Sequence, residues 1–99
     1  MFYRLMVAVS VIGTVTPALA DADNGERLAQ RWCASCHVVA RGQTSATGEA
    51  PPFSAIARRP DFDATKVAYF LLVPHPKMPD MALSRTEASD LAAYIATQK

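Results

Sequence analysis

The chain has 99 residues, with 10 Lys and Arg against 9 Asp and Glu, two cysteines and 51% hydrophobic residues. A formal net charge of +1 gives no electrostatic footprint for nucleic acid. The length allows one small domain, and a domain of this size usually needs a staple, a metal or a large bound group to be stable.

The first 20 residues are expected to be a cleaved secretory signal peptide. Arg4 precedes a short apolar run, and Ala18 and Ala20 place small residues where a signal peptidase cleaves. Ser, Thr, Gly and Pro interrupt the run, whereas a membrane-spanning helix needs about 20 apolar residues. We therefore expect a signal peptide at 1–20, one domain at 21–99, and a periplasmic location for the mature protein.

The domain begins with a polar segment that has helical periodicity. Asp23 is predicted to cap this first helix, which runs to the cysteines with Leu28 and Trp32 on its apolar side. The segment 41–52 (RGQTSATGEAPP) is small, polar and rich in turn-forming residues, which indicates a loop.

Two further helices are predicted in the middle of the chain. A short one spans 53–59, with Phe53, Ile56 and Ala57 inward, and is stopped by Pro60. Asp63 is a plausible cap for the next, whose apolar spacing predicts a helix from about 64 to 73.

The last part of the chain is expected to be a stiff loop followed by a helix. The run 74–81 (PHPKMPDM) holds three prolines and is incompatible with a helix or a central strand. Ser84 and Glu87 form a capping box for the last helix. The shared apolar face of that helix consists of Ala88, Leu91, Tyr94 and Ile95. No strand periodicity stands out, so the predicted fold class is all-α.

The cysteines lie in the stretch RWCASCH, residues 31–37, which fits either a thiol-redox centre or a haem attachment site. A thiol-redox centre places its first cysteine at a helix N-terminus, where the dipole lowers the thiol pKa. Here a polar, helix-periodic segment precedes Cys33 and puts it at a helix C-terminus. A zinc site is a poorer fit, because Cys33, Cys36 and His37 lack a fourth ligand.

The haem interpretation uses every part of the stretch. Two thiols at this spacing reach the two vinyl groups of a porphyrin, and a histidine directly after the second thiol is held beneath the iron. We therefore predict that Cys33 and Cys36 bind one haem c covalently and that His37 is an axial iron ligand.

The sequence resembles the class I cytochromes c over essentially the whole mature chain. The resemblance rests on WCASCH at 32–37, the early Gly25, the Pro51-Pro52-Phe53 element, the KMP loop at 77–79 and the closing helix LSRTEASDLAAYIATQ. It implies four short helices and long loops wrapped around one covalently bound haem. It also implies that the first and last helices cross, with Gly25 beneath Tyr94.

The resemblance further implies that a methionine of the late loop binds the iron opposite His37. Met78, which precedes Pro79, is the expected ligand, with Met81 and His75 as the alternatives. A methionine ligand favours reduced iron.

A proline carbonyl of the loop before the second helix is implied to hold the other ring nitrogen of the axial histidine. Pro51 is the matching residue, and Pro52 is the second choice. Side chains expected in the wall of the haem crevice or the adjoining core are Trp32, Val38, Phe53, Ile56, Phe70, Leu71, Leu83 and Ile95.

The predicted function is transfer of single electrons between periplasmic or membrane-bound redox partners, such as a dehydrogenase, an oxidase or a cytochrome complex of a respiratory chain. The protein is expected to be monomeric, neither an enzyme nor membrane-spanning. The docking rim is expected at Ala34, Ser35 and 76–81, with Lys77 and Arg41 as possible charged guides. The alternative is a haem-based ligand sensor or peroxidase-like module whose sixth iron site opens.

Overall fold

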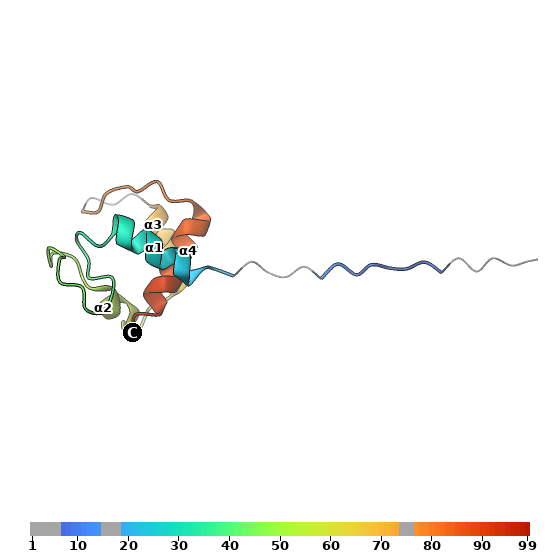
Figure 1. Cartoon of the computed structure of the whole chain (residues 1–99), viewed down its shortest axis with the longest axis horizontal. Coiled ribbons are helices and arrows are strands. Elements are labelled where there is room, and N and C mark those ends of the chain that lie inside the picture. Colours follow the sequence, from blue (N-terminus) through green and yellow to red (C-terminus); the bar gives the residue numbers. More distant parts are fainter. Residues whose placement is uncertain (1–6, 15–18, 74–76) are drawn as a thin grey trace, which may run out of the picture.

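The computed structural model describes residues 7–14, 19–73 and 77–99 of the chain. Four helices follow one another: α1 (Ala22–Trp32), α2 (Phe53–Ala57), α3 (Ala64–Leu72) and α4 (Arg85–Ala96). Long loops join them, and the described residues before α1 extend away from the helices (Figure 1). These ranges contain no extended strand, so the all-α prediction is confirmed. Within the same ranges, none of the helices has the length and apolar character to cross a bilayer.

The N-termini of three helices are fixed by the side chains that cap them. Asp63 caps α3 through the amides of Thr65 and Lys66, and Ser84 caps α4 in a complete capping box, both as predicted. The cap predicted for the first helix is wrong by two residues. The helix already begins at Ala22, where Asp90 of α4 holds the Asp21 amide, so Asp23 lies inside the first turn and Asp21 is the N-cap that accepts the Asn24 amide.

The two middle helices are slightly shorter than predicted. The helix expected at 53–59 ends at Ala57, because Arg58 already bonds back to Ser54 and Ile56 in a tight final turn. Phe53 and Ala57 are buried as expected, whereas Ile56 is only partly buried against the core. The helix expected at 64–73 ends at Leu72.

The crossing of α1 and α4 is the central packing contact of the fold. A Cβ atom built on Gly25 would collide with the backbone carbonyl of Asp90 and would lie 2.8 Å from the Cβ of Tyr94. Only glycine therefore allows the two backbones this close approach. The predicted contact of Gly25 beneath Tyr94 is confirmed.

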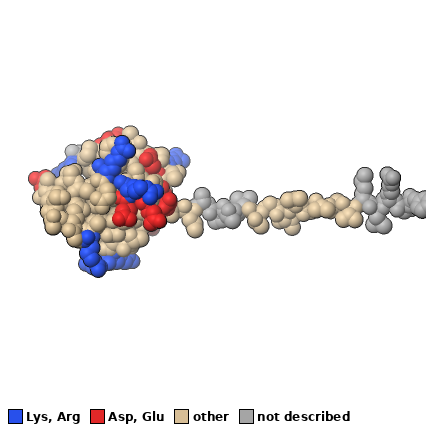
Figure 2. Space-filling view, in the orientation of Figure 1, with Lys and Arg blue, Asp and Glu red and all other residues tan. Residues whose placement is uncertain are grey.

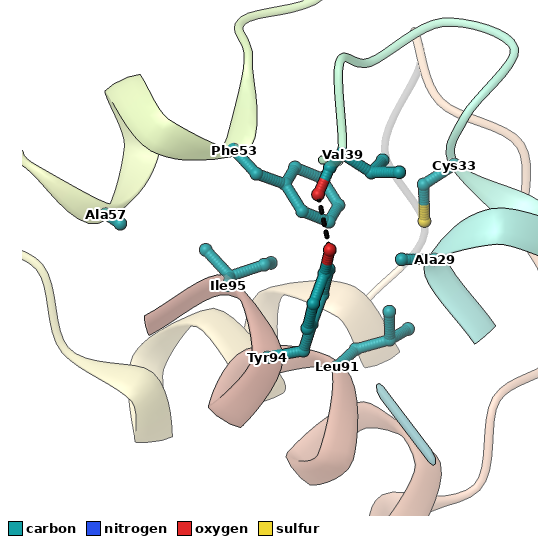
Figure 3. Packing of buried hydrophobic residues seen from close by; sticks show 8 residues of the cluster. All are labelled: Ala29, Cys33, Val39, Phe53, Ala57, Leu91, Tyr94 and Ile95. Atoms are coloured by element: carbon teal, nitrogen blue, oxygen red, sulfur yellow. Dashed lines mark hydrogen bonds between the residues drawn. The ribbon is translucent and has the colours of Figure 1, made fainter. Parts of the chain in front are cut away.

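The buried core joins both crossing helices to α2 and the cysteine segment (Figure 3). Leu91 and Val39 are the largest fully buried side chains. The remaining members of the cluster are Ala29, Cys33, Phe53, Ala57, Tyr94 and Ile95. The core thus contains few large side chains, and part of it is supplied by the segment that carries the candidate site.

Candidate functional site

Residues 33–37 form a compact turn directly after α1. Cys33 caps the C-terminus of α1, its amide bonding the Ala29 carbonyl, and its own carbonyl accepts the amides of Cys36 and His37 at 3.2 and 2.9 Å. Cys33 therefore lies at a helix C-terminus, as predicted from the sequence. We call residues 33–37 the cysteine turn.

The two thiols of the cysteine turn have different surroundings. Cys33 is buried against the core, whereas Cys36 is exposed. Burial, with a smaller contribution from Cys36, raises the pKa of the Cys33 thiol to about 11. A thiol-redox centre needs a thiolate near neutral pH, so this environment speaks against that interpretation.

The ring of His37 is held by the residues that begin α2. Its Nδ1 lies 2.6 Å from the Pro51 carbonyl oxygen, and its ring packs against Phe53 with centroids 5.3 Å apart. A carbonyl oxygen only accepts hydrogen bonds, so the proton must sit on Nδ1. This tautomer leaves the lone pair of Nε2 available for a metal. The structure therefore brings His37 and Pro51 together; Pro52 is instead the N-cap of α2.

Gln43 holds the cysteine turn through its side-chain amide, a role that was not predicted from the sequence. Gln43 Nε2 donates to the carbonyls of Ala34 and His37 at 2.9 and 2.8 Å, and its Oε1 accepts the Val39 amide at 2.9 Å. Gly42, at φ +84°, adopts the left-handed conformation at the turn just before this side chain. An amide in a loop has no sequence signal of its own, which is why the residue was missed.

Helix α4 fixes the chain that follows the cysteine turn. The Tyr94 hydroxyl donates to the Val39 carbonyl at 2.7 Å in the buried interior (Figure 3). Burial and, to a smaller extent, Glu26 raise the pKa of Tyr94 above its usual value, so the hydroxyl keeps the proton that it donates. Phe53 packs edge-on against Tyr94 with centroids 6.3 Å apart. An aromatic series thus connects the crossing helices to His37.

The late loop contributes the remaining candidate ligands. Met78 and Met81 are both half-buried in the described segment 77–84, and His75 lies outside the described residues. This loop arches above α1 in the view of Figure 1.

The expected wall residues fall into two groups. Phe53 and Ile95 are buried in the core, and Ile56, Leu71 and Leu83 pack against it. Trp32 and Phe70, in contrast, are 41% and 54% exposed, with Leu72 and Val73 exposed beside Phe70. Val38, the remaining member, is half-buried. The exposed apolar side chains at 70, 72 and 73 lie close together in the chain, and apolar surface of this kind is typical of a binding site.

The donor set fits a haem better than a metal ion held by protein alone. Among the described residues, no group of three or more His, Cys, Asp or Glu side chains is arranged to hold a metal ion. Two thiols, an imidazole with a free Nε2 and exposed apolar side chains suit a porphyrin instead.

Comparisons with known proteins agree with this chemistry. A family model described as cytochrome C oxidase, cbb3-type, subunit III matches residues 20–95. A curated protein, cytochrome c-552 of Bradyrhizobium diazoefficiens, is 56% identical over 92 residues, which cover 92% of this chain and 88% of that protein. No solved structure gives a significant match.

Proposed function

The chain belongs to the family of cytochrome c domains described as cytochrome c oxidase, cbb3-type, subunit III. We propose that Cys33, Cys36, His37 and Met78 hold its haem and that the protein passes single electrons between redox partners. Membership makes it a small class I monohaem c-type cytochrome that carries covalently bound haem c. It is an electron-transfer protein and not an enzyme.

Cys33 and Cys36 would hold the haem through thioether bonds, and His37 would be its nitrogen ligand. The observation that carries this assignment is the 2.6 Å contact between His37 Nδ1 and the Pro51 carbonyl. It orients the ring, selects the tautomer and strengthens Nε2 as a donor. Gln43 and Tyr94 hold the backbone of the same segment, so the ligand is presented by a preformed turn.

Met78 would be the second protein ligand of the iron. Its thioether is a soft donor that stabilises reduced iron, and Pro79 directly after it restricts the backbone of the loop. If His37 and Met78 both bound the iron, they would leave no coordination position for a small molecule. When bound, the haem supplies a centre that takes up and releases one electron.

The proposed working cycle is exchange of single electrons with a membrane-bound or soluble redox protein outside the cytoplasm. Export through the signal at 1–20 places the protein in the periplasm, where such partners meet it. Residues 21–99 carry nine charges of each sign, and Figure 2 shows acidic and basic side chains beside each other on one face. The association rate should therefore fall only modestly as ionic strength rises.

A ligand exchange tests the assignment. In the purified haem protein, Met78→His should abolish the thioether-to-iron absorption band and lower the midpoint potential, because imidazole stabilises oxidised iron more than a thioether does. Met81→His, a matched change three residues away, should keep both the band and the potential. The reverse pattern would assign Met81 as the ligand.

Two further outcomes would change the function itself. Carbon monoxide binding to the reduced protein at neutral pH would favour the sensor or peroxidase alternative, because it requires an open sixth site. A purified protein with two titratable thiols and no Soret band would contradict haem attachment.

A further inference from the structure

Asp90 is a buried acidic residue that the electron-transfer function does not use. It lies on α4 with only 4% of its surface exposed, next to the N-terminus of α1. Its Oδ1 accepts the backbone amide of Asp21 at 2.7 Å, and its Oδ2 accepts the side-chain amide of Asn24 at 2.9 Å. Both donors are uncharged in the uncleaved chain, although a buried carboxylate is best stabilised by a positive charge.

We propose that signal-peptide cleavage supplies that charge, by turning the Asp21 nitrogen into an α-ammonium group that pairs with Asp90. This inference rests on the proposed export and on cleavage after Ala20. Hydrolysis adds the hydroxyl of water to the Ala20 carbonyl carbon and its hydrogen to the Asp21 nitrogen as the peptide bond breaks. The new amine takes up a further proton from the solvent, because a free α-amino group has a pKa of about 7.7 to 8.0.

The nitrogen of Asp21 is already held in place by the rest of its residue. The Asp21 carbonyl accepts the Gly25 amide at 3.0 Å, and its side chain caps α1 through the Asn24 amide at 3.0 Å. An ammonium group at this position therefore needs little additional ordering to meet Asp90. Charge-assisted hydrogen bonds are stronger than neutral ones, so the α1–α4 crossing gains stability upon cleavage.

The bond to be cleaved lies on the accessible side of this contact. Leu19 is 90% exposed and Ala20 is exposed, and the described residues before α1 extend away from the helices (Figure 1). Cleavage there removes neither the cap of α1 nor a member of the buried core. It changes the charge at one atom while the helices keep their contacts.

Arg85 and the dipole of α1 oppose a positive charge at this position more weakly than Asp90 attracts it. A hollow of about 210 Å³ beside this contact is lined in part by Leu19, Ala20, Arg85 and Asp90. Cleavage removes part of its wall and opens it further to water. Arg85 repels an ammonium group, but it is exposed and therefore screened. The dipole of α1 also opposes a positive charge at its N-terminus, whereas Asp90 is at hydrogen-bond distance.

A double-mutant cycle on the haem protein tests the ion pair. Gly-Ser-Gly inserted between Ala20 and Asp21 moves the mature amino group three residues away and leaves an ordinary amide on Asp21. In chemical unfolding at neutral pH, this extension should lower the folding equilibrium constant about tenfold, which is about 1.4 kcal/mol. In chains carrying Asp90→Asn, the same extension should have almost no effect. Asp23→Asn is the control: it removes an exposed charge from the first turn of α1, and the extension should still lower the folding equilibrium constant about tenfold.

Several results would overturn the proposal. The proposal is wrong if the extension leaves the folding equilibrium constant unchanged in the protein that keeps Asp90, a comparison that can be made even if Asp90→Asn fails to fold. An equal cost with and without Asp90 would also overturn it, since the pair would then be irrelevant. An intact mass showing that the mature haem protein begins elsewhere than at Asp21 would refute this inference and leave the cytochrome function untouched, whereas a colourless protein would refute the function.

Discussion

The α1–α4 crossing and the cysteine turn are built on different principles. The crossing is stabilised by close packing, since Gly25 lets one backbone lie against the other and Leu91 of α4 is fully buried. The cysteine turn buries only Cys33 and depends on hydrogen bonds from other parts of the chain. Close packing tolerates little change of volume, whereas a hydrogen-bonded turn can lose one partner and persist.

The contrast separates what stabilises the fold from what positions the ligand. A substitution at the crossing should affect the whole domain, because α2 and α3 also pack against α4. A substitution in the bonds around the cysteine turn should affect mainly the segment that carries His37.

The largest effect is expected from Gly25→Ala. The added methyl group meets the Asp90 carbonyl and the Tyr94 Cβ, so the helices must separate. We expect a loss of about 3 kcal/mol or more in the free energy of unfolding, despite the gain of about 1 kcal/mol in helix propensity. Chemical denaturation of the haem protein measures it.

The control for this prediction is Gln30→Ala, which changes an exposed position of the same helix. It should change stability by no more than about 0.5 kcal/mol. Equal stability of Gly25→Ala and the unsubstituted protein would show that the crossing can open without cost.

The crossing could be predicted from the sequence and most of the bonding around the cysteine turn could not. The capping box of Ser84 and the cap of Asp63 are local signals, and the early glycine with the late aromatic forms a family pattern. The roles of Gln43 and Asp90, in contrast, depend on partners brought together only by folding. The same limit explains the misplaced cap, since Asp21 and Asp23 are equally plausible when only the local sequence is considered.

An intermediate effect is expected at the bond that joins the two regions. Tyr94→Phe keeps the ring against Phe53 but leaves the buried Val39 carbonyl without this donor. We expect a loss of about 1 to 2 kcal/mol in the free energy of unfolding, with haem attachment retained. Tyr69→Phe is the matched control, because Tyr69 is 71% exposed and its hydroxyl contributes little. Equal losses from the two substitutions would mean that the bond to Val39 does not couple the regions.

The smallest effect on global stability is expected from Gln43→Glu, which changes a side chain that donates hydrogen bonds to the cysteine turn. Glutamate can still accept the Val39 amide, but it cannot donate to the Ala34 and His37 carbonyls and places a negative charge beside them. We expect a loss of about 1 kcal/mol in unfolding and a larger local change, seen as faster amide hydrogen exchange in residues 33–39 than in α4. Gln30→Glu introduces the same charge at an exposed position of α1 and should leave that exchange unchanged. If exchange in α4 rose as much as in the turn, the two regions would open together, and the separation between a packed crossing and a hydrogen-bonded ligand segment would be wrong.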